Sequence, residues 1–156
     1  MHHRVNQLSK VLAATCLIGA IALPAWSEGD HDHSHHGAPR EVPASLPAPT
    51  LALAAFEDTE SGYNLQLIVE NFAFSPSRTG TYSDDIEGHA HLYINEVKVG
   101  RVYGEWFHLP AGLFAEGDNE IRVTLNDNMH SDWAVAGAVV EDIVEVHVHA
   151  SDGHDH

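Results

Sequence analysis

The chain has 156 residues, including 23 acidic, seven basic and 14 histidine side chains, and its formal net charge is −16 with histidine neutral. A surface this acidic repels nucleic acid and anionic membranes, and we exclude both as partners. The excess of acid either keeps the protein soluble or attracts cations, and these two interpretations are compatible. A single cysteine excludes metal sites built from several thiolates.

Residues 1–27 have the pattern of a secretory signal peptide. Arg4 and Lys10 precede an apolar run, and the small residues Ala25 and Ser27 fit the −3 and −1 positions of a cleavage site. The apolar run is shorter than a membrane span requires. We therefore expect a periplasmic or secreted protein with no membrane span after cleavage. Cleavage would also remove Cys16, the only cysteine.

Two histidine-rich tails are predicted to flank the fold. Residues 28–49 begin with a His/Asp cluster and continue as a proline-rich stretch, which is typical of an extended linker. Residues 150–156 form a second His/Asp-rich tail. Such tails bind divalent metal ions weakly and with little selectivity. Their candidate ligands are His31, His33, His35, His36, His154 and His156.

Residues 50–149 are predicted to form one domain. Apolar and polar residues alternate over residues 63–70, 89–94, 121–126 and 144–149, which is the period of half-buried strands. Turn-forming residues separate these segments, and no segment gives a persuasive helix. The pattern predicts an all-β fold, an antiparallel β-sandwich of immunoglobulin-like or cupredoxin-like type.

The first candidate metal site is the His-x-His pair at His89 and His91. Because alternate side chains of a strand point the same way, both imidazoles are expected on one face. Ala90 and Leu92 are expected on the other face, which packs against the core. Their Cα atoms should lie roughly 6.6 Å apart, so both rings can bind one ion. The alternative is a solvated histidine pair on an exposed strand.

The second candidate is the loop that follows the strand at residues 121–126. His130 offers an imidazole there and Met129 offers a thioether. Together with His89 and His91 they give three nitrogens and an optional sulfur, a set that suits copper, whereas three histidines alone also suit zinc. The alternative is that Met129 packs in the core and His130 caps a turn.

Two further places carry candidate ligands. His108 shares a strand face with Trp106, and it is either a shielded ligand or a histidine that hydrogen-bonds at the edge of the core. His147 and His149 share a face with Glu145 and run into the C-terminal tail. We predict an exposed chelating region there, with solvated side chains as the alternative.

Three linked motifs lie in the centre of the chain. They are a Gly-His-x-His-Leu strand from Gly88, a Tyr-Gly-x-Trp-x-His-Leu segment from Tyr103, and a Gly-x-Asn-x-Ile-x-Val-x-Leu strand from Gly117 that is followed by a histidine. This pattern resembles a largely uncharacterised family of small exported bacterial β-sandwich proteins. The resemblance implies a secreted sandwich. It groups four positions worth testing, which are His89, His91, His108 and His130.

The chain departs from that family at one turn. Many relatives have glycine after the asparagine at position 95, whereas this chain has Glu96, so its hairpin turn is expected to differ. A weaker similarity is to copper–zinc superoxide dismutase, which is also a sandwich with a His-x-His copper strand. The dismutase disulfide has no counterpart here, and no His/Asp zinc loop follows either pair.

These observations predict an exported metal-binding protein, with copper as the preferred ion and zinc next. It would act as a periplasmic buffer, chaperone or resistance factor, with a periplasmic metalloprotein or transporter as partner. We expect no enzymatic activity, since no nucleophile arrangement, phosphate loop or carboxylate pair stands out. The alternatives are an immunoglobulin-like interaction domain with structural histidines and a dismutase-like metalloenzyme, which needs an open coordination position.

Overall fold

A computed structural model describes residues 38–149 of the chain. The signal peptide and the six tail histidines predicted above lie outside the described residues. Within residues 38–149, no helix has the length and apolar character to cross a membrane. The elements in chain order are β1 (Arg40–Glu41), β2 (Thr50–Glu57), β3 (Tyr63–Glu70), β4 (Ala73–Phe74), η1 (Pro76–Arg78), β5 (Glu87–Ile94), β6 (Val97–Val102), β7 (Trp106–Leu109), η2 (Ala111–Leu113), β8 (Gly117–Asn126), β9 (Trp133–Val135), β10 (Ala138–Val139) and β11 (Glu141–Val148).

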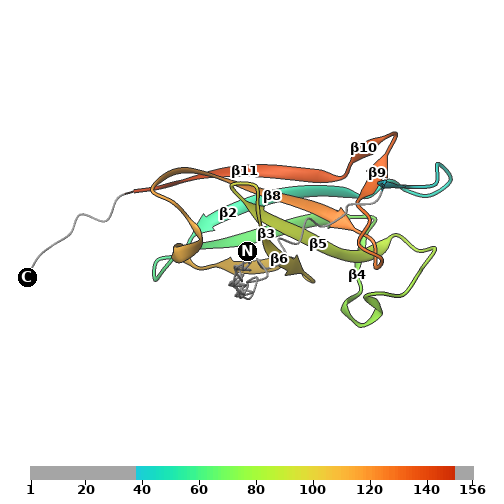
Figure 1. Cartoon of the computed structure of the whole chain (residues 1–156), viewed down its shortest axis with the longest axis horizontal. Helices are drawn as coiled ribbons and strands as arrows, with labels where there is room; N and C mark the ends of the chain where they lie inside the picture. Colours follow the sequence, from blue (N-terminus) through green and yellow to red (C-terminus); the bar gives the residue numbers. More distant parts are fainter. Residues whose placement is uncertain (1–37, 150–156) are drawn as a thin grey trace, which may run out of the picture. The chain divides into compact units, whose positions relative to one another are not determined.

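The described strands form three hydrogen-bonded sheets. The largest has the order β11-β8-β5-β4, with β6 also paired to β5, and its long strands are antiparallel neighbours (Figure 1). A second antiparallel sheet has the order β2-β3-β7, and β1, β9 and β10 form a small third sheet. The prediction of an all-β antiparallel sandwich is confirmed.

The hydrophobic core joins the two larger sheets. Ala90, Leu92 and Ile94 of β5 are almost completely buried, as the alternation predicts. They belong to one apolar cluster with Leu65 and Leu67 of β3. Burying the core face of β5 leaves its other face, which carries the two histidines, available for a site.

The N-terminal boundary of the folded part differs from the prediction. Residues 40–49 are not simply a linker, because β1 pairs in parallel with β9 and Val42 is buried in the core. The guanidinium of Arg40 lies 4.5 Å from the ring centroid of Trp133, within the range of a cation–π contact. These contacts span some 90 residues of sequence, so the local proline content could not indicate them.

The β5–β6 hairpin turns through Asn95 and Glu96, which both have positive φ, 49° and 66°. Ile94 and Val97 pair directly across this two-residue loop, so the geometry is that of a type I′ turn. Glu96 therefore adopts the backbone conformation that glycine adopts most easily. The hairpin places Arg101 of β6 directly opposite His91 of β5.

Candidate metal centre

Strand β5 carries the first two histidines of the site. The side chains of His89 and His91 lie on the face opposite the core, yet they are only 0% and 1% exposed. Their Nε2 atoms are 3.0 Å apart. The alternative of a solvated pair on an exposed strand is therefore wrong, because other parts of the chain cover this face.

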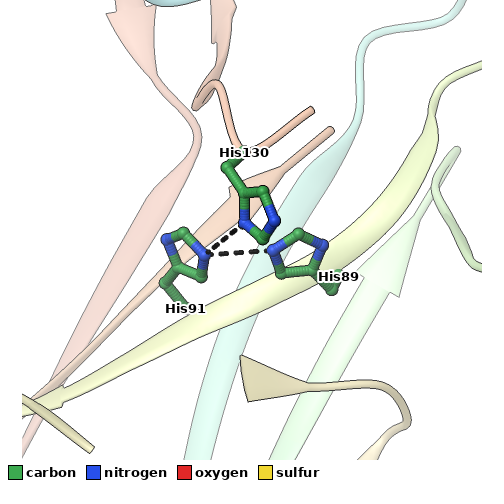
Figure 2. A group of neighbouring side chains, drawn as sticks. All are labelled: His89, His91 and His130. Carbon is green, nitrogen blue, oxygen red and sulfur yellow. Dashed lines mark hydrogen bonds between the residues drawn. The ribbon is translucent and has the colours of Figure 1, made fainter. Parts of the chain in front are cut away.

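The loop after β8 brings the third histidine. The backbone N–H of Asp127 donates to the carbonyl of Ser131, and Oδ1 of Asp127 accepts the N–H groups of Met129 and Ser131. The closed loop holds His130 at a φ of +72°. Its Nδ1 lies 3.5 Å from Nε2 of His91, and Figure 2 shows the three rings gathered over β5.

The three imidazoles form a ligand set. One nitrogen from each of His89, His91 and His130 lies within 4.8 Å of the others, and no other group of three or more potential ligands is found in the described part of the chain. A tetrahedral ion that binds nitrogen at 2.0–2.1 Å holds its ligand nitrogens about 3.3 Å apart. Two of the three separations, 3.0 and 3.5 Å, are close to that value, and the third is at most 4.8 Å.

Burial favours the neutral form of two of these rings, His89 and His130. Removal from water lowers the pKa of His89 from 6.5 to about 4, and the positive charges of His130, Arg101 and Lys98 contribute further. Burial also lowers the pKa of His130, again with help from Arg101 and Lys98. Because only a neutral imidazole can donate its lone pair to a metal, the site needs no proton loss from these two rings at neutral pH.

Ring packing orients His89. Its Nδ1 is buried without a hydrogen-bond partner. Its ring centroid lies 4.7 Å from that of His130 and 5.5 Å from that of Tyr103. The adjacent Gly88 has a φ of +152°, and a Cβ there would lie 2.0 Å from the carbonyl oxygen of Asn126. Glycine thus lets β5 pass close to the end of β8 beside the site.

Polar contacts anchor the His130 loop to the rest of the sandwich. Oδ2 of Asp127 is 3.2 Å from the guanidinium of Arg40. The hydroxyl of Ser75 donates to Oδ1 of Asn128, whose amide donates to Glu87. The sequence alone did not indicate these contacts of Asp127 and Asn128. The run of Asn and Asp residues after β8 does indicate a side-chain-capped turn, but it does not identify the partners.

His108, the further central candidate, does not belong to the cluster. His108 is on β7, in the second sheet, and its Nδ1 lies 3.1 Å from Oδ1 of Asn64 and 3.8 Å from Asp58. It is thus the hydrogen-bonding histidine of the alternative. Met129 is 52% exposed, so the alternative in which it packs in the core is wrong.

His147 and His149 lie exposed at the end of β11, as predicted. Their ring centroids are 4.9 Å apart, and Nδ1 of His147 lies 2.6 Å from a carboxylate oxygen of Asp118. Both line a surface hollow of about 300 Å³ together with the acidic residues Glu57 and Glu60. This arrangement can attract cations, but it brings only two imidazoles together.

Comparisons with described protein families, curated proteins and solved structures find no match to this chain. The fold and the site alone define its class, which is an all-β sandwich with a buried cluster of three histidines that could hold a metal ion.

Proposed function

We propose that this chain is an exported metal-binding protein whose tight site is formed by His89, His91 and His130. One observation carries the proposal, which is three ring nitrogens from His89, His91 and His130 that converge on one point. A metal ion can accept the lone pairs of all three converging nitrogens at once, which hydrogen bonds among three neutral rings cannot do.

Copper is the ion we favour, and zinc is next. Imidazole suits both, and divalent copper binds a given set of nitrogen ligands more tightly than zinc does. Met129 adds a soft thioether on the same loop as His130, where its exposure would allow contact with Cu(I). No carboxylate belongs to the cluster, so calcium and magnesium are poor candidates.

The remaining histidines would act as weaker outer ligands. His147 and His149 lie exposed beside acidic side chains, and the tails add six more imidazoles. In this proposal they capture ions that then pass to the buried cluster. Export rests on the signal-peptide pattern of residues 1–27 and on the family resemblance. The protein would then serve as a periplasmic buffer, chaperone or resistance factor that exchanges metal with a metalloprotein or transporter.

The test uses the full chain with its outer histidines replaced by asparagine. This outer-histidine variant carries changes at His31, His33, His35, His36, His147, His149, His154 and His156. It is titrated with Cu(II) and Zn(II) against a competing chelator. We expect one tightly bound copper per chain and a weaker zinc site.

Matched substitutions then locate the ion. His89→Gln and His91→Gln each remove an Nε2 ligand, and His130→Asn keeps a residue type that tolerates positive φ. Each should lower copper affinity at least a hundredfold. His108→Asn serves as the control and should leave affinity unchanged. Equal affinity in all five proteins would refute the assignment.

A second function is favoured by an apolar surface. The side chains of Phe56, Ile68 and Trp106 are each about half exposed on the β2-β3-β7 sheet. The rings of Phe56 and Trp106 contact each other, with centroids 5.8 Å apart. Such patches mark interaction sites, so an interaction domain is the alternative. Capture of one defined partner that Trp106→Ser abolishes, with no copper bound by the cluster, would favour it over metal binding.

A further inference from the structure

Two cationic side chains stand beside the candidate metal centre, which is unusual for a cation site. Nζ of Lys98 lies 3.5 Å from Nε2 of His91, the nitrogen at the centre of the cluster. Arg101 is the direct cross-strand neighbour of His91. Both side chains lie on β6, in a chain that has only seven basic residues against 23 acidic ones.

The ligand set itself carries no negative charge. The cluster consists of histidines alone, so an ion bound to it keeps its full positive charge. The charge of the Asp127 carboxylate acts on both His89 and His130 and raises the pKa of each. However, its Oδ1 accepts two backbone N–H groups and its Oδ2 pairs with Arg40. That carboxylate is engaged in holding the loop and is not free to bind an ion.

A divalent ion next to an ammonium and a guanidinium is repelled unless an anion lies between them. Three imidazoles also leave a fourth tetrahedral position open. A carboxylate-like anion meets both requirements, because one oxygen can bind the ion while the other accepts hydrogen bonds. The planar fork of arginine and the three donors of lysine both suit such a group.

We propose, resting on the metal site proposed above, that the fourth ligand is a small carboxylate-like oxyanion held jointly by the bound ion and by Lys98, with Arg101 at its entrance. The burial pattern supports access from this side. His89 and His91 are enclosed, whereas His130 and Lys98 are partly exposed and Arg101 is exposed. The metal would thus be taken up and released together with an anion.

The experiment uses the outer-histidine variant of the full chain loaded with Cu(II). Acetate is the probe, and sodium perchlorate keeps the ionic strength constant. The visible d–d absorption band reports a change of copper ligand, and gel filtration confirms that copper stays bound. We expect a saturable band shift with acetate.

Substitutions on β6 test whether the Lys98 side chain holds the anion. Lys98→Met should raise the half-saturating acetate concentration at least tenfold, and Lys98→Arg should keep it within threefold. Arg122→Met is the matched control. It also removes one positive charge from the same sheet, but Arg122 packs over Tyr93 with its guanidinium 4.1 Å from the ring centroid. Its acetate response should stay within twofold of the parent.

The outcomes separate the two proposals. Bound copper with no acetate response, or the same response in Lys98→Met, would overturn the anion site and leave the metal site standing. Tighter copper binding by Lys98→Met without any acetate effect would show that Lys98 only repels the ion, which also overturns the anion site. If no copper binds to the cluster, both proposals fail together.

Discussion

The depressed pKa of His89 makes the metal-free protein sensitive to mild acid. The ring titrates at about 4 in the folded chain and near 6.5 once unfolded. Above pH 6.5 both states hold a neutral ring, and its contribution to stability is complete. As the pH falls from 6.5 to 4, His89 binds a proton in the unfolded chain but stays neutral in the folded chain. The free energy of unfolding therefore decreases.

The size of this loss follows from the pKa difference. At 1.36 kcal/mol per unit, a fall from 6.5 to about 4 corresponds to about 3 kcal/mol. That is a large fraction of the stability of a domain this size, which is typically about 5–15 kcal/mol. The His89 side chain is completely buried, so screening by solvent does not reduce the energy that corresponds to its pKa shift.

Urea unfolding in the presence of a chelator, at pH 7, 5.5 and 4, measures the effect. Other groups also titrate over this range, including His130, whose pKa is lowered chiefly by burial. His89→Gln is therefore compared with the parent, because the contributions of groups that do not interact with His89 cancel in the difference. Between pH 7 and 4 the parent should lose about 3 kcal/mol more than His89→Gln does. Parallel pH profiles for the two proteins would refute the burial argument.

Three further substitutions have distinct expected effects. Gly88→Ala should lower stability by about 2–4 kcal/mol, measured by thermal unfolding, because the added Cβ would lie 2.0 Å from the carbonyl oxygen of Asn126; an unchanged Tm would contradict this. Glu96→Gly should raise stability by about 1 kcal/mol in urea, because it relieves a left-handed backbone at φ 66°, and a loss would show that the side chain matters more. Asp127→Ala should weaken copper binding at least tenfold in the chelator titration, since the His130 loop loses its closing contacts and its tie to Arg40; full affinity would mean that the loop holds without them.

The sequence indicated the fold and the centre of the site well, because both depend on local periodicity. Alternation of apolar side chains identified the core face of β5, and it placed His89 and His91 together on the other face. The loop that follows residues 121–126 offered His130 as a third ligand, and the family resemblance stated above also grouped it with the pair. That resemblance grouped His108 with them, however, and strand alternation cannot show that β7 belongs to a different sheet.

What the sequence did not reveal depends on contacts between distant segments. The burial of His89 and His91 requires the His130 loop to fold back over β5, and that loop is held by Arg40, 87 residues before Asp127. Lys98 was counted only as part of the net charge. Its position beside His91 follows from the hairpin register, which shifts between Leu92 and Tyr93 and is not readable from composition.

The short strand β1 has a practical consequence for trimming the chain. A boundary drawn from composition alone would start the domain at residue 50, and it would discard Arg40 with the proline-rich stretch. The same cut would remove the ion pair to Asp127, the stacking on Trp133 and the buried Val42. Proteolysis before residue 50 would therefore weaken the support of the loop that carries His130, although His89, His91 and His130 themselves would remain in the chain.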